Sequence, residues 1–287
     1  MYKLELRNVT HIYGVRTPFE TTALRCVSVG FETGITTGLI GHTGSGKSTL
    51  VQMLNGLLRP SEGEVLLDGK NIWEKPKEIR SVRFRVGLVM QYPEYQLFDE
   101  TVGRDIGFAL RNMGCPDDEI ERRVKEAAER VGLPDSSLKK SPFDLSGGQR
   151  RRAAIAGILA MEPEVLVLDE PAAGLDPRGR AEILGYLHRY GESNRTTVIL
   201  VSHSMEDMAQ YCDRVVVMRA GEIFADGTTE EIFSDPDRLL SAGMDVPEVT
   251  KIAFELKKRG YPLDGKLYTV EGVRDALLRY LGEGVLR

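Results

Sequence analysis

The sequence predicts an α/β fold: a mostly parallel β-sheet core with an N-terminal antiparallel β-subdomain, an inserted helical subdomain and a small, α-rich C-terminal domain. Three continuous, β-branched runs indicate the parallel sheet, because strands buried on both faces lose the usual polar alternation; they are RVGLVMQ, VLVLDEP and TVILVSH. A glycine-rich loop, GHTGSGKST, directly follows the apolar run TTGLIG. A helical pattern between the first two β-branched runs indicates the inserted subdomain.

Composition limits both the architecture and the partners. The 287 residues, 41% hydrophobic and 28% charged, suffice for one large domain with a small appendage or for two modest domains. The net charge of −5 gives no electrostatic reason to expect a nucleic-acid partner. The widely spaced Cys26, Cys115 and Cys212 favour a reduced, cytosolic setting. No apolar run approaches the ~20 residues that span a bilayer, so another subunit must supply any membrane part.

The flanking segments have the patterns of antiparallel strands. The first forty residues contain the short alternating runs KLELRNV and ALRCVSVGF before TTGLIG. GEVLLDGKNI predicts a hairpin, because Asp68 and Gly69 form a favoured two-residue turn. RVVVMRAGEIFADG predicts a second hairpin that closes the core sheet.

Two regions are predicted to be helical. Within a first domain of residues 1–235, EIERRVKEAAERVGL places apolar residues on one helix face, so we expect a helical subdomain at about 92–160. Residues 236–287 contain two more amphipathic patterns, VPEVTKIAFELKKRG and VEGVRDALLRYL, among prolines and glycines. The helices of this C-terminal extension could dock on their own chain or hold two copies together, and we favour dimerisation.

The loop GHTGSGKS matches the phosphate-binding pattern GxxxxGK followed by Ser or Thr. Its glycines let backbone N–H groups wrap around phosphates at the positive end of the following helix. The Lys47 ammonium can reach the β- and γ-phosphates, and the Ser48 hydroxyl can bind Mg²⁺. The nucleotide-binding residues predicted from this stretch are Gly41, His42, Thr43, Gly44, Ser45, Gly46, Lys47, Ser48 and Thr49.

A second motif supplies two acids. VLVLDE is an apolar strand that delivers Asp169 and Glu170 at its carboxyl end, where ligands bind in open α/β sheets. Asp169 is predicted to hold the magnesium shell, and Glu170 to polarise the attacking water. Together the two motifs predict a nucleoside triphosphatase.

A second glycine-bearing string, LSGGQRRR, needs its own explanation, because one phosphate-binding loop is enough for one nucleotide. Ser146 suits a helix N-cap, and the free amides of Gly147 and Gly148 would form another anion site. With these motifs in this order, the sequence resembles the ATP-binding-cassette (ABC) family, whose signature motif is LSGGQ. The resemblance implies a P-loop NTPase core, with two cassettes head to tail, so that Ser146, Gly147, Gly148 and Gln149 close on the partner's ATP.

The resemblance assigns roles to four further residues. Tyr13 matches the aromatic residue that stacks on adenine, and Gln91 matches the glutamine that contacts magnesium or the lytic water. Asp176 matches the aspartate that links the two sites across the pair. His203 matches the histidine that hydrogen-bonds the γ-phosphate.

These roles define the expected chemistry, an ATPase that uses ATP and Mg²⁺. The catalytic residues would be Glu170, His203 and Gln91, and the magnesium ligands Ser48, Gln91 and Asp169. One departure from the family is the pair of alanines at 172 and 173, where many cassettes have Ser or Thr. Because the catalytic residues and LSGGQ are intact, we expect this copy to hydrolyse ATP.

Two stretches resemble the ATP-binding subunits of energy-coupling factor (ECF) importers, namely QYPEYQLFDETVGRDIGFALRNMG and GILAMEPEVLVLDEPAAGLDPRGR. That resemblance implies a motor for uptake of a vitamin or transition-metal ion. Its partners would be a second ABC ATPase (a paralogue or the same chain), a transmembrane coupling subunit and a membrane-embedded substrate-binding subunit, at the cytoplasmic face of the cell membrane. The alternatives are the ATPase of a conventional ABC importer fed by a soluble binding protein and, less favoured, a non-transport ABC ATPase.

The loop after Gln91 is the expected contact with the membrane partner. Apolar groups cluster there around Glu94, and such a patch suits a groove that receives a partner's helix. We therefore predict that Glu94, Leu97 and Phe98 couple the cassette to the membrane subunits. The alternative is that Leu97 and Phe98 only pack against the helical subdomain beneath the loop.

Overall fold

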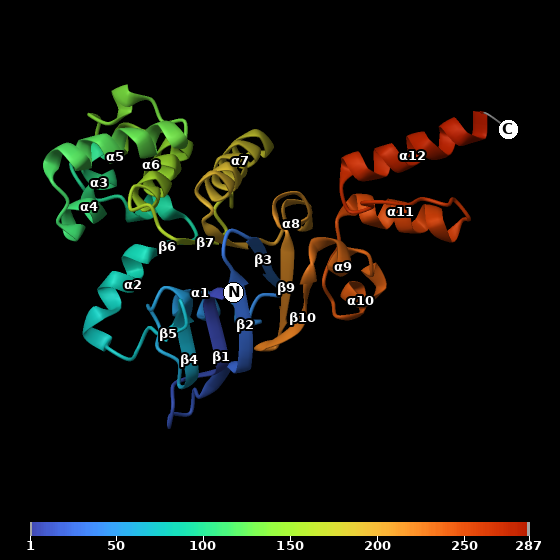
Figure 1. Cartoon of the computed structure of the whole chain (residues 1–287), viewed down its shortest axis with the longest axis horizontal. Helices are drawn as coiled ribbons and strands as arrows, with labels where there is room; N and C mark the ends of the chain where they lie inside the picture. The colour runs from blue at the N-terminus through green and yellow to red at the C-terminus, as the bar shows by residue number, and fades with distance from the viewer. Residues whose placement is uncertain (1, 286–287) are drawn as a thin grey trace.

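The structure is a computed structural model that describes residues 2–285. It contains two β-sheets with a helix between them, further helices over the outer face of the larger sheet, and a helical arm near the C-terminal end (Figure 1). The predicted α/β class with an antiparallel N-terminal sheet is confirmed.

The smaller sheet is antiparallel, with strand order β2–β1–β4–β5. Its strands are β1 Tyr2–Tyr13, β2 Thr21–Glu32, β4 Glu62–Leu67 and β5 Lys70–Asn71. Asp68 and Gly69 both have positive φ angles, 52° and 75°, as a type I′ turn between β4 and β5 requires. The predicted hairpin is confirmed, because Leu67 pairs with Lys70 across this turn.

The larger sheet has the order β10–β9–β3–β8–β7–β6 and is parallel except for the edge strand β10. Its strands are β3 Thr36–Gly41, β6 Val86–Val89, β7 Val165–Asp169, β8 Thr197–Val201, β9 Arg214–Arg219 and β10 Glu222–Thr228. The three β-branched runs form the adjacent, buried strands β6, β7 and β8, as predicted. The loops after β3, β6, β7 and β8 therefore meet at one edge, which we call the carboxyl edge.

Helix α1, Lys47–Leu54, lies between the two sheets. Its side chains Leu50, Met53 and Leu54 are buried in a core shared with β1, β2, β4 and the inner face of the larger sheet. The start of α1 is thereby fixed where β3 ends, so the loop between them has little freedom to move.

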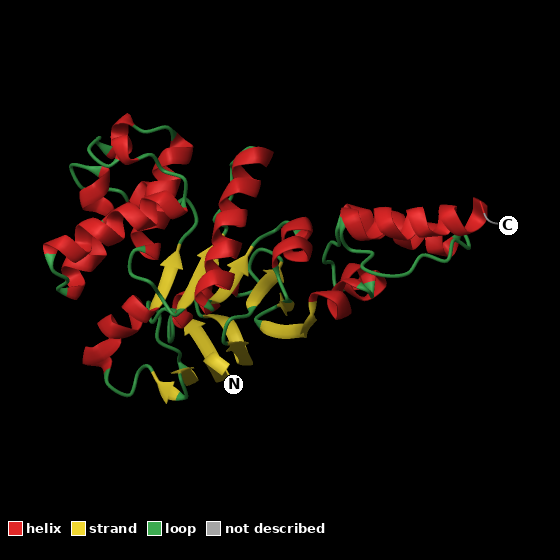
Figure 2. Ribbon diagram, turned by 45° about the horizontal axis from the view of Figure 1, so that its top comes forward, coloured by secondary structure: helices red, strands yellow, loops and turns green. Residues whose placement is uncertain are grey.

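The outer face of the larger sheet packs against helices. Between β5 and β9 the chain forms the helices η1 Pro76–Glu78, α2 Ile79–Arg85, η2 Pro93–Gln96, α3 Val102–Ile106, α4 Phe108–Met113, α5 Asp117–Arg130, η3 Asp135–Ser137, η4 Pro142–Asp144, α6 Gly147–Leu159, α7 Pro177–Asn194 and α8 Met205–Tyr211. Helix α2 is not one of those on the outer face, because its side chains Ile79 and Val82 pack against the inner core. Helix α5 buries Ile120, Val124, Ala127 and Ala128, the face that its periodicity predicted. Helices α3 to α6 form a cluster at one end of the molecule (Figure 2).

The C-terminal helices lie at the opposite end (Figure 1; Figure 2). They are α9 Thr229–Phe233, α10 Pro236–Ser241, α11 Glu248–Lys258 and α12 Val270–Val285. Ala253, Val273 and Ala276 are buried, but Ile252 is 57% exposed and Leu281 is 60% exposed. The apolar stripes of α11 and α12 are thus only partly covered by the described residues.

Two expectations from composition concern the membrane and the cysteines. Among the helices formed by residues 2–285, none is long and apolar enough to cross a membrane. Within these described residues, Cys26, Cys115 and Cys212 are free thiols.

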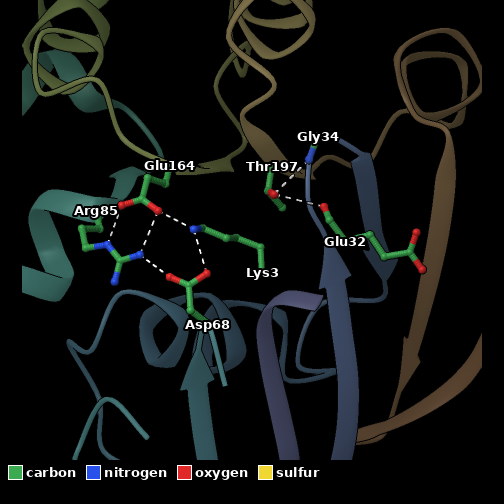
Figure 3. Close-up of polar contacts among 7 residues, drawn as sticks. All are labelled: Lys3, Glu32, Gly34, Asp68, Arg85, Glu164 and Thr197. Carbon is green, nitrogen blue, oxygen red and sulfur yellow. Dashed lines mark hydrogen bonds and ion pairs between the residues drawn. The ribbon is translucent and has the colours of Figure 1, made fainter. Parts of the chain in front are cut away.

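Four charged side chains join the two sheets at the amino edge, where β6 and β7 begin (Figure 3). Lys3 Nζ lies 2.8 Å from Asp68 Oδ1 and also pairs with Glu164. Arg85 Nε lies 2.5 Å from Glu164 Oε1, and the same guanidinium pairs with Asp68. The hydrogen bonds from Arg85 outweigh partial burial and lower the pKa of Glu164 to about 2. We call Lys3, Asp68, Arg85 and Glu164 the amino-edge network.

Candidate active site

A cleft of about 530 Å³ opens at the carboxyl edge. The residues that line it are Tyr13, Thr21, Thr22, Ala23, Thr43, Gly44, Gly46, Lys47, Ser48, Thr49, Gln91, Asp169, Glu170, Val201 and His203. The fold therefore brings together predicted residues from the first strand, the glycine loop and the ends of β6, β7 and β8. Sequence reasoning missed the contribution of Thr21, Thr22 and Ala23, since the start of β2 carries no motif.

Gly46 and the buried ammonium group of Lys47 determine the shape of the glycine loop. Gly46 has a φ of 101°, and a Cβ there would lie 2.7 Å from the Ala23 carbonyl oxygen, so only glycine fits. Lys47 Nζ donates to the carbonyl oxygens of Gly41, at 2.5 Å, and His42, at 3.0 Å. Burial lowers the pKa of Lys47, because neutral carbonyls compensate poorly for lost water. A phosphate group would satisfy this ammonium better.

Three of the predicted loop residues lie off the cleft wall. Gly41 and Ser45 are buried beneath the loop, and the described residues offer no hydrogen-bond partner to the Ser45 hydroxyl. The His42 side chain is exposed and lies beside Gly243 instead of in the cleft. These residues shape the loop from behind, whereas Thr43, Gly44 and the start of α1 face the cavity.

Asp169 and Glu170 differ in backbone conformation. Asp169 ends β7, whereas Glu170 has a φ of 52°, which is uncommon for a residue other than glycine, and its amide donates to Val201 O at 3.0 Å. Within the described chain, Glu170 Oε1 is buried without a hydrogen-bond partner, and His203 Nε2 lies 3.5 Å away. Burial, reinforced by the Asp169 carboxylate, raises the pKa of Glu170 to about 7. Such strain and poor pairing are typical of functional positions.

Asp169 and His203, like Glu170, have pKa values shifted so that the neutral form is favoured. Burial raises the pKa of Asp169, and burial together with the Lys47 charge lowers the pKa of His203. Each group is therefore less easily charged than in water. Ser48, Gln91 and Asp169 present the oxygen donors that Mg²⁺ prefers, so the residues fit that cation.

Tyr13 is the last residue of β1 and lines the cleft, although it is far from Asp169 and Glu170 in the sequence. Its hydroxyl lies 3.2 Å from Thr49 Oγ1, and its ring is partly exposed on the cleft wall. A flat ring held in this way offers a stacking surface for a base.

The signature turn lies outside the cleft. Ser146 Oγ accepts from Gln149 N at 3.3 Å, and Gln149 Oε1 accepts from Ser146 N at 3.1 Å, which is a complete capping box. A Cβ at Gly147 or Gly148 would meet no atom within 4 Å. In the part of the chain that the structure describes, none of residues 146–149 lines the cleft. Asp176 is also exposed, and it caps α7 by accepting from Gly179 N at 2.8 Å.

The predicted partner-contact loop differs from expectation at Glu94, which does not lie on an exposed patch. Its side chain is 13% exposed, and its carboxylate accepts two hydrogen bonds from Arg151, at 2.7 and 2.9 Å. Leu97 is partly buried against the core of the helical cluster. Phe98 is 63% exposed and contacts Phe108 edge-on, with ring centroids 4.9 Å apart. Phe98 is therefore the accessible member of the three.

Arg151 is the main residue that sequence reasoning missed, because it stands in a run of three arginines that resembles a charged surface. It is only 3% exposed. Its guanidinium binds Glu94 and the carbonyl oxygen of Ala173, so it joins the loop after β6, helix α6 and the turn that begins with Glu170. The available signal was periodicity: Arg151, Ile155 and Leu159 share the buried face of α6.

Comparisons with known proteins agree with this geometry. The sequence model of the ABC transporter family matches residues 24–173. The protein named energy-coupling factor transporter ATP-binding protein EcfA2 from Clostridium perfringens is 49% identical over 97% of this chain and 98% of its own length. The EcfA2 protein of Symbiobacterium thermophilum is 50% identical over 92% of this chain and 91% of its own.

Solved structures give the same result. The structure of cbiO1 from Clostridium perfringens, part of the ABC transporter complex cbiONQ, has a TM-score of 0.75 and 36% identity, covering 89% of this chain and 99% of that one. The dimeric ATP-binding cassette MJ0796, bound to ADP and Pi after hydrolysis, has a TM-score of 0.72 and 27% identity, covering 79% and 98%. This chain therefore belongs to the ABC transporter family, as an ATP-hydrolysing cassette of the energy-coupling factor type.

Proposed function

We propose that this chain pairs with a second cassette and drives uptake of a vitamin or transition-metal ion through membrane partner subunits. The observation that carries the proposal is the position of the signature turn, whose free amides at Gly147 and Gly148 lie outside the cleft of their own chain. An anion site in that position is useful when a second cassette, a paralogue or another copy, presents its nucleotide to it. Asp176, exposed at the start of α7, would contact the same partner.

ATP is the substrate of the cleft in this proposal. Tyr13 would stack on adenine, and the loop of residues 43–49 would surround the phosphates. Lys47 would exchange the carbonyls of Gly41 and His42 for phosphate oxygens. Bound Mg²⁺ would neutralise phosphate charge, with ligands from Ser48, Gln91 and Asp169.

Hydrolysis would begin at the Glu170 carboxylate. As the water oxygen bonds to the γ-phosphorus, Glu170 takes the water proton and the bond from phosphorus to the ADP oxygen breaks. A pKa of about 7 suits a base that works near neutral pH. His203, 3.5 Å from Glu170, would hydrogen-bond the γ-phosphate, and Gln91 would hold the water.

Transmission to the membrane would start at the loop that contains Glu94, Leu97 and Phe98. We assign the direct contact to Phe98, because its ring is exposed, and an internal role to Glu94 and Leu97. Arg151 then connects the loop to the signature helix and to the turn after Glu170. A displaced loop would therefore move the cleft of one composite site and the signature turn of the other.

Residues 1–235 would form the nucleotide-binding domain and residues 236–287 a dimerisation extension. Exposed apolar side chains on α11 and α12, including Ile252, Leu278 and Leu281, support a contact with the second cassette. Such a contact would keep the pair together after ATP has been hydrolysed. The assembly would lie at the cytoplasmic face of the cell membrane, held there by its membrane subunits.

The test is purification of the tagged chain from membranes, followed by identification of bound proteins. We expect a second cassette and two different membrane proteins, and ATP-driven uptake when the complex is placed in vesicles. Recovery with a conventional pair of transmembrane subunits and a soluble binding protein would overturn the importer type. Recovery without any membrane protein would overturn the transport role.

A pair of variants tests the contact loop. Phe98→Asp should abolish recovery of the membrane subunits while ATP binding stays unchanged, because a charge would be placed in an apolar contact. Leu57→Asp, at an exposed apolar position in the turn after α1, is the matched control and should retain the complex. Equal recovery of the two variants would show that the loop is only structural.

A further inference from the structure

The segment that joins α10 to α11, residues 242–247, passes beside the glycine loop. Gly243 has a φ of 79°, and a Cβ there would lie 2.9 Å from His42 Nε2. The segment is fixed in place, because the side chains of Met244 and Val246 are buried in the main core and Met244 N donates to Leu239 O at 2.9 Å. The connection to the C-terminal helices is therefore a packed strap.

His42, which lies beside Gly243, also binds the ammonium group of Lys47. The His42 side chain lies off the cleft, but its carbonyl oxygen accepts from Lys47 Nζ at 3.0 Å and from Ser45 N at 3.1 Å. A displacement of His42 that reaches its backbone would move an oxygen that binds the Lys47 ammonium. The strap can thus act on the position of Lys47 without entering the cleft.

A second contact joins the end of the strap to the opposite wall of the cleft. The Glu248 amide, at the start of α11, donates to Glu206 Oε1 at 3.2 Å. Glu206 Oε2 accepts from Ser204 Oγ at 3.1 Å, and Ser204 caps α8 directly after His203. The two ends of one short segment therefore contact the loop before Lys47 and the turn after His203.

We propose that the strap of residues 242–247, together with Glu248 at the start of α11, positions these two walls of the ATPase site, so that the C-terminal helices and hydrolysis are coupled. His42, Gly243 and Glu206 are positioning residues, because they act through Lys47 and His203. For ATP binding, such coupling is reciprocal: a partner that holds the C-terminal helices changes the affinity of the site for ATP, and bound ATP changes the preferred position of the helices.

The first experiment measures ATP turnover by the purified full-length chain with Gly243→Ala. We expect kcat to fall about fivefold or more, within the usual range of coupling between sites. Gly260→Ala is the matched control: its φ of 90° gives similar backbone strain, but a Cβ there meets no atom within 4 Å, so turnover should stay unchanged. Adding His42→Ala to Gly243→Ala removes the close contact and should restore turnover to that of His42→Ala alone. Equal turnover of the two glycine variants, or no recovery in the double variant, would overturn the proposal.

The second experiment keeps the proposal testable if Gly243→Ala fails to fold. Glu206→Gln retains an oxygen that can accept from the Glu248 amide, whereas Glu206→Ala does not. We expect Glu206→Ala to lower kcat severalfold with an unchanged KM for ATP, since the contact reaches the His203 side of the cleft, and Glu206→Gln to behave like the unsubstituted chain. Identical kinetics for the two variants would show that this contact does not position the site.

Discussion

The two edges of the larger sheet hold similar charged residues in opposite electrostatic situations. At the amino edge, Lys3, Asp68, Arg85 and Glu164 form mutual ion pairs, and the pKa of Glu164 falls to about 2. At the carboxyl edge, Glu170 Oε1 is buried without a hydrogen-bond partner in the described chain, and its pKa rises to about 7. Both glutamates flank the same strand, β7.

This difference separates stability from function within one strand. The amino-edge network satisfies its own charges and joins the two sheets, so it needs nothing from outside the chain. The cleft keeps Lys47, Asp169 and Glu170 partly uncompensated, and a nucleotide with its cation would supply the missing partners. Active sites commonly carry such a stability cost.

The largest expected effect comes from Glu170→Gln. The amide cannot accept the proton of the attacking water, so ATP turnover should fall by about 10²- to 10⁴-fold. Nucleotide binding should persist and trap the closed pair, because the cleft keeps its shape. Turnover and nucleotide affinity are measured on the same preparation. Undiminished hydrolysis would remove Glu170 from the role of base.

Arg151→Met tests whether a paired charge at the carboxyl edge behaves like one at the amino edge. The substitution leaves the buried Glu94 carboxylate without its partner, which should lower the free energy of unfolding by about 3 kcal/mol. Urea unfolding measures this loss, with the partly buried Arg150→Met as control. Adding Glu94→Gln should recover part of the loss; a loss that is the same in the double variant would mean that the pair is not what Arg151 stabilises.

The cleft could be predicted closely because its parts are local. A glycine loop, two acids after an apolar run and a histidine after another run each occupy a few consecutive residues, and parallel strands bring their carboxyl ends together. The sequence could not reveal which charges pair. Arg151 and Glu94 are 57 positions apart, so no short pattern relates them, and Glu94 was expected on an exposed patch.

The C-terminal strap was hidden for the same reason. In the sequence, Gly243 is one of several prolines and glycines around the two C-terminal helical patterns, and only the fold places it beside His42. The amino-edge network likewise joins four segments of the chain, none of which has a motif of its own. Local motifs predicted what binds the nucleotide, whereas the contacts that hold those motifs in place depend on tertiary structure.

Glu170→Gln should also stabilise the nucleotide-free chain. Below pH 4.5, the ordinary pKa of the group, the carboxyl is protonated in both the folded and unfolded states and no penalty exists. The penalty grows as the pH rises from 4.5 to about 7, where the folded carboxyl ionises, and it is complete above that pH. Urea unfolding at pH 8 should therefore show a gain of roughly 1–3 kcal/mol, which disappears near pH 4.5. A loss of stability at pH 8 would contradict the unpaired state of this carboxylate.

Glu164→Gln should have the smallest effect on the free energy of unfolding, and it should be a loss, whereas Glu170→Gln gives a gain. The side chain is partly exposed, so water screens its pairs with Lys3 and Arg85, and the loss of stability should be less than about 1 kcal/mol at pH 7. Because the folded pKa is lowered, the stabilisation is complete above pH 4.5 and declines as the pH falls toward 2. The difference in unfolding free energy between Glu164→Gln and the unsubstituted chain should shrink over that interval. A difference that stays constant across it would show that charge pairing is not what Glu164 contributes, and the contrast between the two ends of β7 would then rest on Glu170 alone.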